Sequence, residues 1–162
     1  MKKQKHEKLL KIVTALIIVI IVSSLAIIHI ANRPVRKAKS EAKKIAADIA
    51  GIDRVTDFYW FTREKTYFTI LGSDTKGTNL TVFIPDDGSE AVVMDQAKGT
   101  TEDDIIQSVL EFDGVKRIKK ISLGMQKKQP VWEVVTTSQD GGLNYYLLDY
   151  TNGKVVQEIK NV

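Results

Sequence analysis

Residues 12–30, with the sequence IVTALIIVIIVSSLAIIHI, form a run of 19 residues that carries no formal charge when His29 is neutral. A helix of this length spans about 28 Å at a rise of about 1.5 Å per residue, which matches the hydrocarbon core of a bilayer. Helices in the cores of globular proteins rarely stay apolar on every side over such a length. The run therefore predicts a transmembrane signal anchor, and any folded domain must lie beside it in the chain.

Lysines precede this run and further cations follow it, so the flanking charges alone do not orient it. A basic N-terminal tail followed by one apolar segment is typical of a signal anchor. We therefore predict a cytoplasmic tail at residues 1–11, a single pass through the cell membrane at residues 12–30 and an extracytoplasmic C-terminal body. A cleaved signal peptide is the alternative, because Ser24 and Ala26 have the spacing of a cleavage site. The apolar residues that continue after Ala26 favour the retained anchor.

The charge and the residue types of the body exclude several functions. The net charge of +4 lies wholly in residues 1–30, and the remaining chain carries 19 cations and 19 anions. A nucleic-acid-binding body would need a cationic excess, so no nucleic-acid partner is predicted. The chain has no Cys, and its two His residues, His6 and His29, lie outside the body. Thiol nucleophiles, zinc–thiolate sites and His-based catalysis are therefore absent from the expected body chemistry.

The body contains one pattern twice. Residues 35–52 place Ala38, Ala42, Ile45, Ile49 and Ile52 on one helical face, and three strand-like runs and a fourth short strand follow. A second helix begins after Thr101, with acidic residues in its first turn, and four more strand-like runs follow it.

The two halves align at an offset of 64 to 65 residues, which places Gly77 on Gly141 and Gly88 on Gly153. A single unit of about 60 residues has a marginal core, so we expect the two to pack together. The predicted fold class is α+β, with a transmembrane helix and two tandem units at residues 31–96 and 97–162. Each unit is one helix packed on a small antiparallel sheet.

Two segments carry a resemblance to a known family. TYFTILGSDTKGTNLTVFIP in the first unit and WEVVTTSQDGGLNYYLLDYTNGKVV in the second resemble the TseB-like regulators of cell-wall elongation, which are membrane-anchored proteins of Gram-positive bacteria. The second unit also resembles a PepSY domain in Trp132-Glu133-Val134, in Asp140-Gly141 and in the run from Asp149 to Val155. The resemblance implies tandem cystatin-like units and a penicillin-binding protein as the partner.

Two groups of residues are candidates for partner binding. On a strand, Phe58 and Trp60 share one face, while Tyr59 and Phe61 share the other. The helix of the unit can cover only one of these faces, so the second must pack on the other unit or meet a partner. The basic run contains Lys116, Arg117, Lys119 and Lys120, with Lys127 and Lys128 on the next loop. These cations either bind an anionic wall polymer or lipid headgroups, or they guard an edge strand.

No catalytic, cofactor-binding or metal-binding motif is recognisable in the body. Asp140-Gly141-Gly142 is typical of a hairpin turn, and Asp86-Asp87 lacks the further oxygens of a calcium loop. We therefore expect a non-enzymatic regulator of cell-wall elongation with neither a cofactor nor a small-molecule substrate. A peptidase inhibitor and a scaffold that binds wall polymer are the alternative functions.

Overall fold

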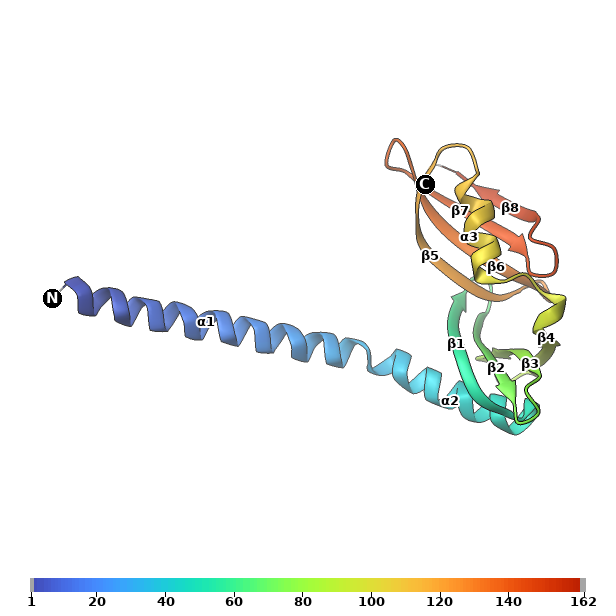
Figure 1. The fold of residues 1–162 in the computed structure, drawn as a ribbon, viewed down its shortest axis with the longest axis horizontal. Coiled ribbons are helices and arrows are strands. Elements are labelled where there is room, and N and C mark those ends of the chain that lie inside the picture. The colour runs from blue at the N-terminus through green and yellow to red at the C-terminus, as the bar shows by residue number, and fades with distance from the viewer. Residues whose placement is uncertain (1, 161–162) are drawn as a thin grey trace. The chain divides into compact units, whose positions relative to one another are not determined.

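The computed structural model describes residues 2–160, with side chains described from Lys11 onward. It divides into two compact parts, residues 1–38 and 39–162. Helix α1 (Lys2–Ala31) contains the predicted span, and within the described residues it belongs to the one helical segment that is long and apolar enough to cross a membrane (Figure 1). None of the apolar stretch is buried against protein. Such a helix is a candidate membrane anchor.

The first α+β arrangement follows directly. Helix α2 (Arg33–Ala50) precedes an antiparallel sheet of strands β1 (Ile52–Thr62), β2 (Thr66–Asp74), β3 (Asn79–Pro85) and β4 (Val92–Asp95), in the order β1-β2-β3-β4. Ala42 and Ala46 are fully buried against Ile70 and Val82 of the sheet. Small side chains at these two positions let the helix approach the sheet closely.

The predicted apolar face of this helix is partly wrong. Ile52 lies in β1 and not in the helix, and Ile45 and Ile49 remain 40% and 50% exposed. The helix instead uses Ala42 and Ala46, which are four residues apart and therefore lie above one another. Each α-helical residue advances by about 100° around the axis, so Ile45 and Ile49 lie to one side of the line through Ala42 and Ala46.

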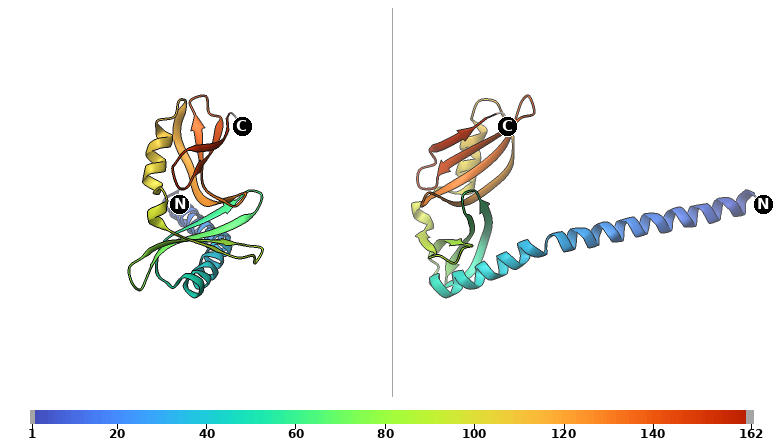
Figure 2. Two further views of the ribbon diagram at one scale, coloured as in Figure 1. Left: turned by 90° about the vertical axis from the view of Figure 1, so that its right-hand side faces the viewer. Right: turned by 180° about the vertical axis from the view of Figure 1, so that it is seen from behind.

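The second arrangement repeats the first. A short 3-10 helix η1 (Gln96–Lys98) leads to helix α3 (Glu102–Leu110) and then to strands β5 (Val115–Gln126), β6 (Gln129–Ser138), β7 (Leu143–Asp149) and β8 (Val155–Ile159), in the order β5-β6-β7-β8. Ile105 and Val109 of α3 are buried in the core with Trp132. Figure 2 shows this helix in yellow against the orange and red strands. Two helix-plus-sheet arrangements with antiparallel strands confirm the predicted α+β class.

The turns also repeat. Gly77 and Gly141, which the sequence alignment pairs, have φ angles of 84° and 93°. Both angles lie in the left-handed region, where a side chain is strained and glycine is not. The alignment of the two halves therefore pairs residues with the same backbone role. The exact unit boundaries at residues 31–96 and 97–162 stay a prediction.

The two sheets share a core within residues 39–162. Phe83 and the partly buried Leu71 of the first sheet pack in the cluster that contains Trp132 and Tyr146 of the second. Polar side chains also link the sheets. The Thr69 hydroxyl donates to the Leu123 carbonyl at 2.7 Å, and the hydroxyls of Thr81 and Tyr150 are 2.9 Å apart. The first sheet is therefore covered by α2 on one face and by the second arrangement on the other.

Candidate functional site

The register of β1 separates the aromatic run into two environments. Phe58 pairs with Ile70 and Trp60 pairs with Phe68, and all four side chains lie on the face that α2 covers. Tyr59 and Phe61, which pair with Thr69 and Tyr67, lie on the opposite face. The alternation of strand side chains predicts these two pairs correctly. The structure adds that Tyr59 and Phe61 are the pair that meets the second arrangement.

Phe58 and Trp60 form an aromatic cluster with Phe68. The rings of Phe58 and Phe68 are stacked with centroids 6.3 Å apart, and Trp60 meets Phe68 edge-on at 5.1 Å. The Lys39 ammonium lies 6.0 Å from the centroid of the Phe58 ring. Trp60 is 37% exposed, and its indole N–H donates to the Thr62 hydroxyl at 3.1 Å. The cluster thus has a buried side and an accessible indole. Whether it binds a partner stays a proposal.

Phe61 fills the contact between the two sheets. Its side chain is completely buried with Val131 and Leu147. A Cβ atom added at Gly124 would lie 2.2 Å from the Phe61 ring, so only glycine at residue 124 leaves room for this ring. Close packing of this kind transmits any change in volume to both neighbours. Phe61 is therefore a structural residue.

Tyr59 connects β1 to the second helix. Its ring meets Trp132 edge-on with centroids 5.3 Å apart, and its hydroxyl donates a hydrogen bond to the Glu102 carboxylate. Burial raises the pKa of Tyr59, and the hydrogen bond to Glu102 raises it further. The phenol therefore stays protonated and serves as a hydrogen-bond donor.

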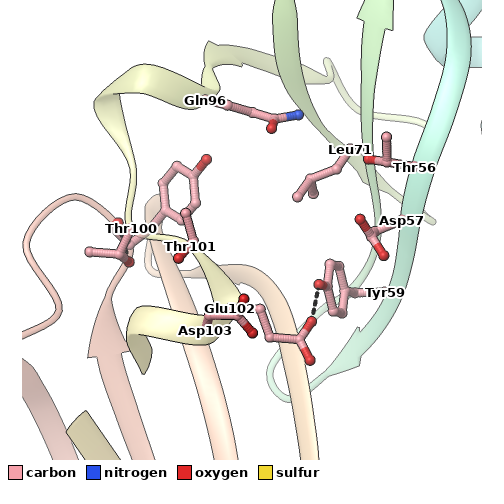
Figure 3. A pocket seen from close by; sticks show the side chains of 10 residues that line it. Thr56, Asp57, Tyr59, Leu71, Gln96, Thr100, Thr101, Glu102 and Asp103 are labelled. Atoms are coloured by element: carbon pink, nitrogen blue, oxygen red, sulfur yellow. Dashed lines mark hydrogen bonds between the residues drawn. The ribbon is translucent and has the colours of Figure 1, made fainter. Parts of the chain in front are cut away.

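A cavity of about 360 Å³ opens beside Tyr59, between β1, η1 and the start of α3 (Figure 3). Its lining includes the carboxylates of Asp57, Glu102 and Asp103 and the phenol of Tyr150. Acidic residues in the first turn of α3 are explained by the helix dipole. Within the described part of the chain, no group of three or more metal-ligating side chains could hold an ion. The acidic lining by itself therefore defines no ligand.

The basic run lies on β5, at the edge of the second sheet. Arg117 pairs with Thr137 and Lys120 pairs with Val135, whereas Lys116 and Lys119 are skipped at the two register shifts. All four side chains are exposed. The structure brings these cations together on one strand, but it places them on a different sheet from Phe58 and Trp60. Their role in partner binding also stays a proposal.

One buried ion pair was not predicted from the sequence. Arg63, in the β1–β2 turn, donates from Nε to the Glu133 carboxylate at 2.7 Å, and the two side chains are only 19% and 8% exposed. Glu133 also accepts from the Ser122 hydroxyl at 3.3 Å, and the Lys120 ammonium lies 4.0 Å from it. The partners are 70 residues apart. No local pattern signals such a pairing.

Known proteins are similar to this chain in sequence and in structure. The family described as "Cell wall elongation regulator TseB-like domain" matches residues 41–85, which reach from α2 through β3. A solved structure, the YpmB protein from Bacillus subtilis, is similar with a TM-score of 0.63 and 25% identity, over 77% of this chain and 95% of that chain. The chain is similar to TseB-like proteins in sequence and in fold.

A curated relative shows a longer similarity to this chain. The "Probable cell wall elongation regulator TseB" of Bacillus subtilis (strain 168) is 29% identical over 123 residues, which cover 75% of this chain and 74% of that protein. This similarity extends well beyond the 45 residues of the family match.

Proposed function

We propose that this chain is a membrane-anchored, extracytoplasmic binding protein that regulates cell-wall elongation by contacting a penicillin-binding protein. The similarity to a relative named as a probable cell wall elongation regulator is the observation that carries the proposal. The apolar helix α1 supports a single-pass anchor. A basic tail before a single apolar segment favours residues 1–11 in the cytoplasm and the body outside. An anchor raises the effective concentration of a binding protein around partners in the same membrane without adding any contact.

A non-enzymatic role agrees with the chemistry of the body. No His or Cys lies in residues 31–162, so the usual proton shuttle and thiol nucleophile are missing from the sequence there. The carboxylates beside the cavity at Tyr59 also have structural reasons to be there. Glu102 accepts from Tyr59, and the acidic first turn stabilises α3.

Crosslinking in intact cells tests the proposed partner. The full chain is treated with a membrane-permeant crosslinker, and the captured proteins are identified by mass spectrometry. The control carries the same residues 1–34 on an unrelated soluble domain, which separates contact with the body from mere proximity in the membrane. We expect a penicillin-binding protein with the full chain and not with the control. Capture of a peptidase alone would instead support the inhibitor, and recovery of wall polymer alone would support the scaffold.

A further inference from the structure

A second and larger cavity lies where three connections of residues 39–162 meet. It measures about 760 Å³ and is lined by the tip of the β1–β2 hairpin, the connection from β3 to β4 and the tip of the β5–β6 hairpin. This volume lies within the range of about 300–1,000 Å³ that is typical of ligand pockets. We call it the hairpin cleft. It is separate from the acidic cavity beside Tyr59, and of the cations that the sequence singles out only Lys127 and Lys128 line it.

The lining of the hairpin cleft combines an apolar surface with free cations. Tyr67, Val92 and Met125 supply the apolar part, and Val92 is 37% exposed. Lys127 and Lys128 supply the cations, and within the described residues neither has an ion-pair partner. An accessible apolar surface beside two unpaired ammonium groups suits a ligand that is both apolar and anionic.

Three further charged residues line the cleft, namely Glu64, Lys65 and Glu90. The Lys65 ammonium lies 2.6 Å from the Asp87 carboxylate, and Glu64 accepts from the Gln126 amide at 3.1 Å. Glu90 is the remaining acidic residue of the lining. Glu64 and Glu90 keep their negative charge, since a hydrogen bond from an amide neutralises none, but they belong to the two other connections. The two adjacent ammonium groups at the β5–β6 tip are therefore the place where an incoming carboxylate would bind.

The backbone of that tip is unusual for its sequence. Lys127 and Lys128 form the two-residue loop between β5 and β6, with φ angles of 49° and 67°. Two-residue hairpin loops that need positive φ at both positions strongly favour Asn-Gly or Asp-Gly. Lysines are strained there, and strain of this kind concentrates at functional sites. Two lysines that are kept in such a loop favour a binding role for their side chains.

An unpaired acceptor lies in the same wall. The Gln126 amide oxygen is buried and accepts no hydrogen bond, although the amide nitrogen donates to Glu64. Gln126 lines the cleft, and the terminal torsion of glutamine has a broad, soft energy profile, so a rotation that gives up the bond to Glu64 would let this oxygen accept from a bound ligand. A backbone N–H of a bound chain would then satisfy it. Hydroxyl groups of a phosphate polymer or a lipid headgroup could also donate to this oxygen, but neither offers an apolar side chain to Val92 and Met125.

We propose that the hairpin cleft binds an extended segment of a partner protein in which an apolar side chain is flanked by carboxylates. The apolar side chain lies against Val92 and Met125, and the carboxylates meet Lys127 and Lys128. The identity of the partner rests on the proposed function, but the cleft and its preference do not. The binding measurement uses purified components, so its failure is distinguishable from a failure of the crosslinking experiment.

The test uses the full chain in nanodiscs of phosphatidylcholine and a fluorescent eight-residue peptide of alternating leucine and glutamate, followed by anisotropy. The key variant is Lys127→Asn/Lys128→Gly, which removes both charges and supplies the residues that this turn favours. We expect its melting temperature to rise and its affinity for the peptide to fall about tenfold or more. Because the variant gains stability, lost binding cannot be attributed to unfolding.

Three controls define the occupant. Lys43→Gln/Lys44→Gln removes the same charge from α2, far along the chain, and should bind the peptide like the wild type. Val92→Ser should weaken the leucine–glutamate peptide, and a serine–glutamate peptide should bind poorly to the wild type. The proposal is wrong if the wild type binds no peptide or if the Lys127/Lys128 variant binds as well as the wild type. It is also wrong if phosphatidylglycerol vesicles or polyphosphate bind this face while the leucine side chains make no difference.

Discussion

At the scale of the residue, neighbours in the aromatic run have opposite roles. Trp60 lies on the α2 face of the first sheet and keeps 37% of its surface exposed, whereas Phe61 is fully buried against Val131 and Leu147. The alternation of strand side chains alone causes this difference. A substitution at either residue therefore reports on a different contact.

The two aromatic residues should differ strongly in their contribution to stability. We expect Phe61→Ala to lower the free energy of unfolding by about 3–5 kcal/mol, as large-to-small changes in a core do. Trp60→Ala should cost clearly less, because much of the indole is accessible. Urea denaturation of both variants in the full chain measures this, with intrinsic fluorescence from Trp132 as a common signal. Equal losses for the two variants would contradict the assigned environments.

Partner binding by the exposed indole is measured on the same preparations. A pull-down in which Trp60→Ala loses the partner while its melting temperature stays close to that of the wild type would support Phe58 and Trp60 as an interface. Unchanged capture would withdraw that proposal.

Sequence reasoning works for residues where the pattern is local. It predicts that Phe58 and Trp60 share one face of the strand, and the register of β1 and β2 confirms this. It does not predict which of the two faces meets the second sheet, because that depends on contacts distant in the chain. It also fails for Ile45 and Ile49, since hydrophobicity alone favours them over the smaller alanines that lie against the sheet.

At the scale of the element, α3 begins with a complete capping box. The Thr101 hydroxyl accepts from the Asp104 N–H at 3.2 Å, and the Asp104 carboxylate accepts from the Thr101 N–H at 3.1 Å. These two bonds satisfy backbone donors that a helix start otherwise leaves unpaired. The hydrogen bonds from Thr101, the side-chain one first, hold the pKa of Asp104 below its usual value.

The stability that this carboxylate contributes should depend on pH. Because its pKa is lower in the folded chain, the contribution is fully present above the unfolded pKa of about 3.9 and is lost as the pH falls through the lowered value. We therefore expect the full chain to be more stable than Asp104→Asn at neutral pH. The difference should shrink as the pH falls below about 4.

The measurement is thermal unfolding of the wild type and Asp104→Asn at several pH values. Asp103→Asn is the matched control, since it removes the neighbouring charge of the same helical turn without touching the capping box. A gap between wild type and Asp104→Asn that stays constant down to the lowest pH would contradict the assigned role of the carboxylate.

Elements were predictable to the extent that their signals are local. Thr101 before an acidic turn predicts the start of α3, and the aligned glycines predict the repeated turns. The extension of β5 to Gln126 and the strained turn at Lys127 and Lys128 were not predictable, since no preferred turn residue marks them. The hairpin cleft depends on this turn and was therefore invisible in the sequence.

At the scale of the whole molecule, an apolar N-terminal helix precedes a folded body that we propose binds a partner protein. The similarity to a relative named as a probable cell wall elongation regulator favours the proposed role in regulation. Contacts with such a partner can be weak when anchor and partner share a membrane, because tethering raises their effective concentration. The central claim is therefore that the body acts only when it is tethered.

Rescue of cell elongation in cells that lack the gene tests this claim most directly. Three forms are compared at matched abundance: the full chain, the chain with residues 12–30 replaced by an unrelated membrane span, and the body from Val35 onward secreted without an anchor. The account predicts that the first two restore normal cell length and that the secreted body does not. Full rescue by the secreted body would contradict it.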